Sequence, residues 1–173
     1  MADMNKLIPF IFKWEGGWSN HKNDKGGATN MGVTIATWKR HGYDKNRDGV
    51  IDVKDLKLIT KEDAVRILRI YWNKWKADQI NNQSIANILV DWVWGSGANG
   101  IKIPQRILGV KQDGIVGPKT IEAINKYEQK TLFDKIHKAR EQYFRDICRR
   151  DNTQYVFLNG WLNRLNSFKF QNN

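Results

Sequence analysis

Residues 15–34 read EGGWSNHKNDKGGATNMGVT, and this stretch constrains the fold more than any other. Residues 5–14 before it carry apolar side chains at helical spacing, which predicts a helix. The glycine pair at 16–17 predicts the end of that helix. Residues 18–31 are rich in Gly, Asn, Asp and Ser, which predicts a loop or a short hairpin. An acidic residue, Glu15, therefore stands where an apolar helix meets a polar loop.

The remainder of the chain has mostly helical periodicity. Apolar residues recur at helical spacing in the segments 33–40, 60–75, 84–94, 118–127, 131–148 and 154–168. Thr60 and Asp63 predict a capping box at the start of the second segment, and Pro118 suits the first turn of the fourth. Residues 43–58 read as a polar, Asp-rich loop. Because strand-like alternation is nearly absent, we expect a mainly α fold with a small loop or hairpin element.

Glycines gather at residues 95–100, and this is the only plausible seam in the chain. We therefore divide the sequence into a region 1–95 and a helical region 96–173. The second region is expected either as a small lobe or packed with the first as one unit.

The composition is that of a folded and strongly basic protein. The chain has 173 residues, 40% of them hydrophobic, with eight Trp, seven Phe and five Tyr, which is enough to build a core. Its single cysteine, Cys148, excludes an intramolecular disulfide and a multi-cysteine metal site, and its apolar neighbours predict burial. The formal net charge of +11 predicts an anionic partner. Nucleic acid, an anionic membrane and the bacterial wall all fit that charge.

Neither a membrane span nor an export signal is predicted. No apolar run approaches the roughly 18 residues that a membrane helix needs. The apolar stretch at 7–12 lacks a basic segment before it and a small-residue cleavage site after it, so it does not read as a signal peptide. We expect a protein that is made in the cytoplasm, does not insert into membranes and reaches an external target by another route.

Glu15 and Asp24 are the candidate catalytic carboxyls. Glu15 lies between Trp14 and Gly16, and aromatic surroundings disfavour the ionised form of a carboxyl, as a proton donor requires. Asp24 lies in the polar loop, where a carboxylate can remain ionised and position water or stabilise positive charge on a sugar. Taken alone, the two residues also fit surface carboxylates near a turn.

The sequence motifs around these residues resemble those of glycoside hydrolase family 108, whose members are peptidoglycan-cleaving lysozymes of phages and bacteria. The matching segments are EGGWSN at 15–20, DKGGATNMGVT at 24–34, DWVWGSG at 91–97, LGVKQDGIVGPKTIEAI at 108–124 and NGWLNR at 159–164. They occur in the family's order and cover nearly the whole chain. The Glu of the family's EGG motif is catalytic and corresponds to Glu15.

The resemblance also implies roles for neighbours of Glu15. The spacing of Glu15, eight residues, Asp24, five residues and Asn30 is similar to the Glu–Asp–Thr triad of phage-type lysozymes. The third residue of that triad is usually Thr, and here Asn30 stands there with Thr29 beside it, so either can fill the role. The glycines Gly26, Gly27 and Gly32 fit a tight hairpin that, as the resemblance implies, would let a sugar approach the backbone. Trp18 is expected either as a platform for a sugar or as an ordinary loop residue.

The resemblance implies hydrolysis of the β-1,4 bond between N-acetylmuramic acid and N-acetylglucosamine in peptidoglycan, with Glu15 as general acid and without a cofactor. It implies a lysozyme-like catalytic fold in 1–95 and a peptidoglycan-binding region in 96–173. A monomeric endolysin of a phage or prophage, released to the wall through a holin, fits the missing export signal.

Three rival functions are weaker. A lytic transglycosylase would act on the same bond, and Asp24 favours hydrolysis over it. A non-catalytic wall-binding or secretion-regulating protein is disfavoured by the intact Glu15. A nucleic-acid binder has only the charge in its favour, so we expect no nucleic-acid partner.

A second motif has the spacing of a calcium-binding loop. Asp44, Asn46, Asp48, Gly49, Val50, Asp52 and Asp55 stand at positions 1, 3, 5, 6, 7, 9 and 12 of such a loop. The glycine at position 6 allows a sharp turn, and the residue at position 7 offers its carbonyl oxygen. Asp55 stands where Glu is usual and reaches less far. The pattern predicts a structural calcium ion, and a metal-free loop held by Asx turns is the alternative.

The remaining residues of interest have plainer interpretations. Asp91 lies among apolar residues and is expected either to be buried and paired or to face solvent. Trp72, Trp75 and Trp92 lie on apolar helix faces and are expected in the core.

Overall fold

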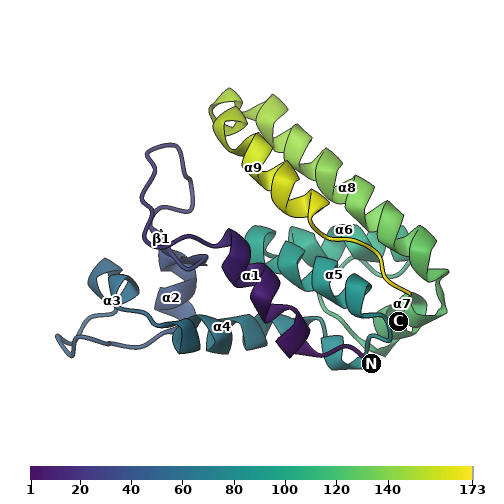
Figure 1. Cartoon of the computed structure of the whole chain (residues 1–173), viewed down its shortest axis with the longest axis horizontal. Coiled ribbons are helices and arrows are strands. Elements are labelled where there is room, and N and C mark those ends of the chain that lie inside the picture. Colours follow the sequence, from purple (N-terminus) through teal and green to yellow (C-terminus); the bar gives the residue numbers. More distant parts are fainter. Residues whose placement is uncertain (173) are drawn as a thin grey trace. The chain divides into compact units, whose positions relative to one another are not determined.

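The computed structural model describes residues 1–172. The chain divides into two compact units, one formed by Ile8–Ile70 and the other by Met1–Leu7 together with the chain from Tyr71 onward. Helices dominate both units, and the strands of the described residues form one two-stranded antiparallel sheet (Figure 1). The expected mainly α fold with a small hairpin is confirmed.

The unit Ile8–Ile70 begins with a short apolar helix. Its elements are α1 (Ile8–Trp14), β1 (Thr29–Asn30), β2 (Val33–Thr34), α2 (Ile35–His41), α3 (Val53–Lys57) and the start of α4 (Lys61–Lys74). Pro9 lies in the first turn of α1, and the helix ends before the Gly16–Gly17 pair, as the sequence predicts. The helix predicted at 33–40 forms as α2 but begins at Ile35, because Val33 and Thr34 belong to β2. The Thr34 hydroxyl caps its start by accepting a hydrogen bond from the Thr37 amide at 3.2 Å.

Strands β1 and β2 form a hairpin with a two-residue turn. Thr29 pairs with Thr34 and Asn30 with Val33, so that Met31 and Gly32 form the turn. Both turn residues have positive φ angles, 52° and 79°. A turn of this kind has the twist that closes a tight antiparallel hairpin, and it favours glycine.

Two capping boxes begin the next helices. In the expected one, at the start of α4, the Asp63 carboxylate accepts a hydrogen bond from the Thr60 amide at 2.8 Å. The Asp63 amide in turn donates a hydrogen bond to the Thr60 hydroxyl at 3.2 Å. In the other, Asp52 and Asp55 start α3, a single turn inside the segment 43–58 that the sequence predicted as loop. The reciprocal hydrogen bonds of this box satisfy backbone N–H groups at the start of α3. The capping pattern was not recognised in the sequence because the whole segment is rich in Asp.

The second unit is organised around one buried helix. Its elements are η1 (Met4–Lys6), the end of α4, η2 (Ala77–Gln79), α5 (Gln83–Ser96), α6 (Asn99–Leu108), α7 (Pro118–Lys126), α8 (Gln129–Arg150), η3 (Asn152–Gln154) and α9 (Tyr155–Asn166). Every residue from Ser84 to Val93 in α5 is buried, which marks α5 as the core helix of the unit. The expected burial of Trp72, Trp75 and Trp92 is confirmed.

Helix α6 was not predicted from the sequence. It contains Gly100 and Pro104, which weaken helix propensity, and its N-cap residue Ala98 provides no side-chain cap. Its stability comes from packing against α5: a Cβ atom at Gly100 would lie 2.6 Å from the Val93 nitrogen, so the two helix backbones almost touch there. Tertiary packing therefore outweighs the weak local signal.

Helices α8 and α9 lie side by side in this unit (Figure 1). The predicted segments 131–148 and 154–168 fall on these two helices, and Pro118 begins α7 as expected. Cys148 is fully buried on α8, and burial raises the pKa of its thiol, so it is a core residue as predicted. Helix α5, from the predicted region 1–95, belongs to the same compact unit as residues 96–172, so compact units and predicted sequence regions divide the chain differently.

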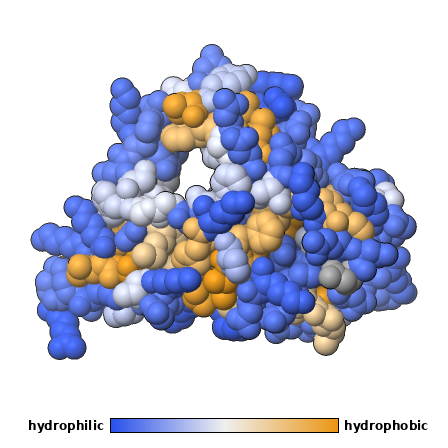
Figure 2. Space-filling view, in the orientation of Figure 1, coloured by the Kyte–Doolittle hydropathy of each residue, from blue (hydrophilic) through white to orange (hydrophobic). Residues whose placement is uncertain are grey.

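Hydrophilic residues cover most of the face drawn in Figure 2. Among residues 1–172, none of the helices combines the length and the hydropathy needed to cross a lipid bilayer.

Candidate active site

Glu15 directly follows α1, and its carboxyl group lies against the hairpin turn. The Glu15 amide donates a hydrogen bond to the Ile11 carbonyl at 2.9 Å, which extends the last turn of α1 to this residue. A Cβ atom at Gly32 would lie 2.6 and 2.7 Å from the two carboxyl oxygens of Glu15. The missing side chain of Gly32 therefore provides the space that the Glu15 carboxyl occupies.

The chain after Glu15 folds back onto the same hairpin. Ser19 and Thr29 exchange two backbone hydrogen bonds, of 2.9 and 2.8 Å, as an isolated antiparallel bridge beside β1. Trp18, next to this bridge, is 40% exposed. The Lys57 ammonium lies 4.9 Å from the centre of its ring. The bridge and the Glu15–Gly32 contact hold both ends of EGGWS against the hairpin.

Asp24 lies in the loop that this bridge closes, between Ser19 and Thr29, in a turn of its own. One of its carboxyl oxygens accepts a hydrogen bond from the Gly26 amide at 2.8 Å, and its carbonyl accepts one from the Gly27 amide at 3.0 Å. A Cβ atom at Gly26 would lie 3.2 Å from the same carboxyl oxygen, and Gly27 has a positive φ of 74°. Both glycines thus shape the turn that holds the Asp24 carboxylate.

Thr29 and Asn30 differ in their surroundings. Asn30 is 6% exposed, and its side-chain nitrogen donates hydrogen bonds to the carbonyls of Leu56 at 2.9 Å and Lys57 at 3.4 Å. Its amide thereby fastens the hairpin to the end of α3. Thr29 is more exposed, and successive residues of a strand point to opposite faces. The side chain of Thr29 is therefore the freer of the two to meet a ligand.

The 44–55 loop brings three carboxylates together. One oxygen from each of Asp44, Asp48 and Asp55 lies within 4.8 Å of the other two. Asp44 accepts hydrogen bonds from the amides of Asp48 at 3.2 Å and Gly49 at 2.8 Å. Gly49 has a φ of 88°, as the sharp turn at position 6 requires.

The other predicted ligands of the loop lie outside this group of three carboxylates. Asp52 caps α3 by accepting a hydrogen bond from the Lys54 amide at 2.9 Å, and the side chain of Val50 is exposed. The Asn46 side chain donates to Asp48 at 3.1 Å. The donor set fits a hard cation such as Ca²⁺. These internal hydrogen bonds are also those of a loop held by Asx turns.

Asp55 is the buried residue of this loop. Its carboxylate accepts hydrogen bonds from the backbone amides of Asp52 at 2.9 Å, Lys45 at 2.8 Å and Asn46 at 3.1 Å. These bonds, that from Asp52 first, hold the pKa of Asp55 below its ordinary value. The residue at position 12 is thus ionised and fixed by the scaffold.

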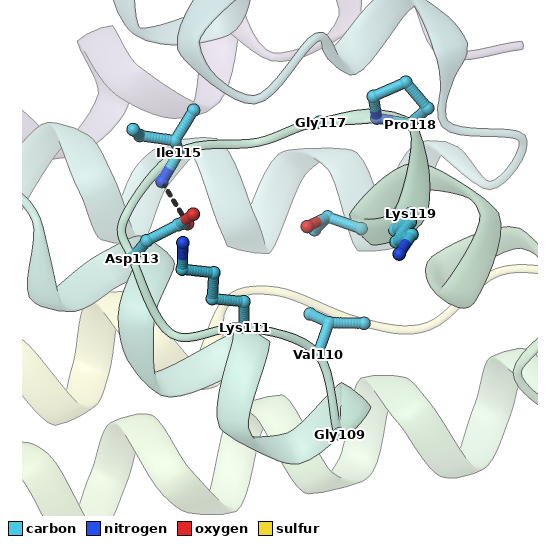
Figure 3. A pocket seen from close by; sticks show the side chains of 9 residues that line it. Gly109, Val110, Lys111, Asp113, Ile115, Gly117, Pro118 and Lys119 are labelled. Carbon is cyan, nitrogen blue, oxygen red and sulfur yellow. Dashed lines mark hydrogen bonds between the residues drawn. The ribbon is translucent and has the colours of Figure 1, made fainter.

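The second unit has a cavity at the DGIVGP segment. The cavity has a volume of about 660 Å³ and is lined by Gly109, Val110, Lys111, Asp113, Ile115, Gly117, Pro118, Lys119 and Thr120. Figure 3 shows Lys111 beside Asp113 on one side of it and Lys119 near Pro118 on the other. Ile115 is 71% exposed, and its amide donates to Asp113 at 2.9 Å. The cavity thus combines apolar side chains with two lysines.

Gln105, which sequence reasoning missed, holds this segment in place. It is fully buried on α6, donates to the Ile115 carbonyl at 2.9 Å and accepts from the Gly114 amide at 3.0 Å. It also donates to Asp113 at 3.3 Å. Its importance could not be seen in a sequence whose α6 was not predicted.

Asp91 is buried and paired, the first of its two expected alternatives. It is 1% exposed, and its carboxylate accepts hydrogen bonds from Arg140 at 2.8 Å and from Arg164 at 2.6 Å. Burial pushes the pKa of Asp91 upward, but the two guanidiniums, Arg164 first, outweigh burial and leave that pKa below its ordinary value. Neither arginine was identified from the sequence, because they lie on α8 and α9.

Comparison with known proteins agrees with this architecture. Residues 8–97 match the family described as Glycosyl hydrolase 108, and residues 99–166 match the Predicted Peptidoglycan domain. Among solved structures, the chain is similar to SagA of Brucella abortus, with 32% sequence identity and a TM-score of 0.78, over 95% of this chain and 90% of that one. No protein with a curated description matches the chain.

These matches confirm the family resemblance and the lysozyme-like, mainly α fold that the sequence implied. They support a glycoside hydrolase that acts on peptidoglycan. The chain belongs to glycosyl hydrolase family 108 and carries the predicted peptidoglycan domain after it.

Proposed function

We propose that this protein is an N-acetylmuramidase, which hydrolyses the β-1,4 bond between N-acetylmuramic acid and N-acetylglucosamine with Glu15 as general acid. The observation that carries the proposal is the place of the Glu15 carboxyl, at the end of α1 and against the side-chain-free Gly32. This arrangement fixes the Glu15 carboxyl beside the hairpin. The loop next to the hairpin carries a second carboxyl, that of Asp24. A glycosidase needs two such groups with different tasks.

The proposed reaction follows from these two groups. Glu15 donates its proton to the glycosidic oxygen, the bond from that oxygen to the anomeric carbon breaks, and N-acetylglucosamine leaves as an alcohol. A water molecule adds its hydroxyl to the anomeric carbon, and its proton passes to a carboxylate. Asp24 is the second carboxyl of the proposal, because the Gly26 amide and the flanking turn hold it as an acceptor. It either activates this water or stabilises positive charge on the sugar.

The substrate contacts of the proposal lie around the hairpin. Trp18 exposes enough of its ring for a sugar face to stack on it. Thr29 is the proposed third residue of the triad, because the side-chain amide of Asn30 already binds the end of α3. Gly26 and Gly27 leave backbone uncovered beside Asp24.

The second unit offers contacts that would hold the protein on the bacterial wall. The cavity of the DGIVGP segment, with Lys111, Lys119 and the exposed Ile115, offers both cationic and apolar contacts to a glycan peptide polymer. The net charge of +11 would add a long-range attraction to an anionic wall. Such attraction is screened by salt, so binding to insoluble peptidoglycan should weaken as ionic strength rises.

Identification of the product ends tests the proposal. Purified peptidoglycan is digested, the new ends are reduced with borohydride, and the fragments are identified by mass spectrometry. The proposal predicts fragments that end in reduced muramic acid. Anhydromuramic ends would instead indicate a lytic transglycosylase, reduced glucosamine ends the other glycosidic bond, and an absence of products a binding protein.

A further inference from the structure

A second cavity in the unit of α5, α8 and α9 is separate from the DGIVGP segment. Its volume is about 380 Å³, and the residues that matter in its lining are Ser96, Arg140, Tyr143, Phe144, Trp161 and Arg164. Two segments quoted above, DWVWGSG at 91–97 and NGWLNR at 159–164, meet at this cavity. The proposed catalytic reaction uses neither segment.

Two guanidiniums and one carboxylate meet beside the cavity. Arg140 and Arg164 both bind the carboxylate of Asp91. Arg140 is only 3% exposed, and its Nε and Nη1 atoms have no hydrogen-bond partner in the described residues. A buried cation with unpartnered N–H groups is unfavourable, and an anion placed beside it would offset that cost.

The surroundings of Arg140 disfavour its charge in a second way. Burial lowers the pKa of its guanidinium and outweighs the attraction of Asp91. Its guanidinium carbon lies 5.4 Å from the centre of the Phe144 ring, a contact that compensates the charge only in part.

Aromatic side chains form one wall of the cavity. The ring of Trp161 lies 5.2 Å from that of Phe144, and Tyr143 continues the cluster 6.0 Å from Phe144. Such a wall accepts methyl groups or the apolar face of a sugar. The volume is at the lower end of the range for small-molecule sites, which suits a ligand the size of an amino sugar with a short peptide.

We propose that this cavity binds the carboxylate-bearing peptide stem attached to muramic acid. Guanidinium groups match the planar carboxylate, and the aromatic wall suits the alanyl methyl groups and the sugar of the same ligand. The inference rests on the proposed function, since it assigns a part of the peptidoglycan substrate to a site outside the hairpin. Arg140 and Trp161 are its recognition residues.

The first test uses the wild-type protein and muramyl dipeptide, which has N-acetylmuramic acid, L-alanine and a free carboxylate. When muramyl dipeptide is titrated to about 10 mM, the indole N–H resonance of Trp161 should shift in a saturable manner. This concentration range covers dissociation constants of millimolar and tighter. N,N′,N″-triacetylchitotriose, an uncharged sugar, and glycerol phosphate, an anion without apolar groups, each offer only one of the two kinds of contact and should shift this resonance far less. Absence of a shift with muramyl dipeptide would overturn the inference, as would an equal shift with either control.

Two variants test the recognition residues. Arg140→Gln removes the buried cation with unpartnered N–H groups and leaves the Asp91–Arg164 pair, so it should weaken muramyl dipeptide binding at least about tenfold. Trp161→Leu should do the same, whereas Tyr155→Leu, an exposed aromatic on α9 outside the cavity lining, should bind like the wild type. Binding is also read as an increase of Tm with ligand, because a ligand of the native state stabilises by mass action. Undiminished binding by folded Arg140→Gln would contradict the proposal.

Failure of this inference and failure of the proposed function are distinguishable. Cleavage of glycan strands whose peptides have been removed depends on the hairpin site alone. If the wild type cleaves such strands but muramyl dipeptide leaves Trp161 unaffected, the peptide site is wrong and the muramidase proposal stands. If the dipeptide binds at Trp161 and no strand is cleaved, the muramidase proposal is the one that fails.

Discussion

The carboxyl group of Glu15 lies directly against the α-carbon of Gly32, in a contact that no larger residue at position 32 would permit. Gly32 is needed there for two reasons. Its φ of 79° suits a residue without a Cβ atom, and the place of that atom is taken by the Glu15 carboxyl. The hairpin turn therefore determines where the proposed acid sits.

Replacement of Gly32 tests this relationship. Gly32→Ala should lower kcat at least about tenfold, because the new methyl group displaces the carboxyl that the proposed mechanism requires within hydrogen-bond reach of the glycosidic oxygen. It should also lower the free energy of unfolding by about 1–2 kcal/mol, the cost of a left-handed residue with a side chain. Release of reducing ends from peptidoglycan and chemical denaturation measure the two effects.

Gly49→Ala is the matched control for this substitution. Gly49 has a φ of 88° with nothing within 4 Å of its missing Cβ atom. The Gly49→Ala protein should lose a comparable free energy of unfolding and keep the wild-type turnover per folded molecule. An equal loss of turnover in both variants would mean that Gly32 acts through stability alone.

Asp24→Asn should impair turnover strongly, but less than loss of the acid. The asparagine oxygen can still accept the hydrogen bond from the Gly26 amide, so the turn is retained, while the negative charge that stabilises the oxocarbenium-like state is lost. The effect should lie in kcat more than in KM, as expected for an interaction made mainly in the transition state. Full turnover by this variant would show that the second carboxyl is elsewhere.

A calcium ion at the 44–55 loop remains our proposal, and its test is thermal. If Ca²⁺ binds the native loop, Tm should rise with added calcium and fall with chelator. Asp48→Asn should abolish the response, because it removes one of the three convergent charges and keeps an oxygen to accept from the Val50 amide. Identical melting curves of the wild type with calcium and with chelator would leave the loop metal-free.

Acid should weaken the protein through Asp91. The folded-state pKa of this carboxyl is lowered, so its stabilising contribution is complete above its unfolded pKa of about 4 and is lost as pH falls through the folded value. Asp91→Asn should cost about 3–5 kcal/mol near neutrality, since it removes the carboxylate that binds the buried Arg140 and the half-buried Arg164. Denaturation curves between pH 7 and strongly acidic conditions should show a smaller pH dependence in the variant. An unchanged pH dependence would assign the acid sensitivity to other carboxyls.

Local signals in the sequence predicted much of the fold. The capping box of Thr60 and Asp63, the apolar face of α4 and Pro118 at the start of α7 are each set by residues within a few positions of one another. Interactions over that range are encoded in spacing alone. The position of Glu15 after an apolar helix was predictable for the same reason.

Features that depend on distant residues were not predictable. Helix α6 forms against α5 despite Gly100 and Pro104, and no local pattern reports that support. The partners of Asp91 follow 49 and 73 residues later on other helices. Likewise, the sequence placed Gly32 in a hairpin, but only the folded chain shows that its missing side chain makes room for Glu15.

The most direct measurement of the central claim is the turnover of Glu15→Gln on purified peptidoglycan. The amide has nearly the shape of the carboxyl and cannot donate the required proton, and positioned general acid catalysis contributes about 10²–10⁴-fold. Muramic acid ends released by the variant should therefore fall at least about a hundredfold below the wild type, with an unchanged Tm. A folded Glu15→Gln protein that retains more than about a tenth of wild-type turnover would contradict Glu15 as the acid.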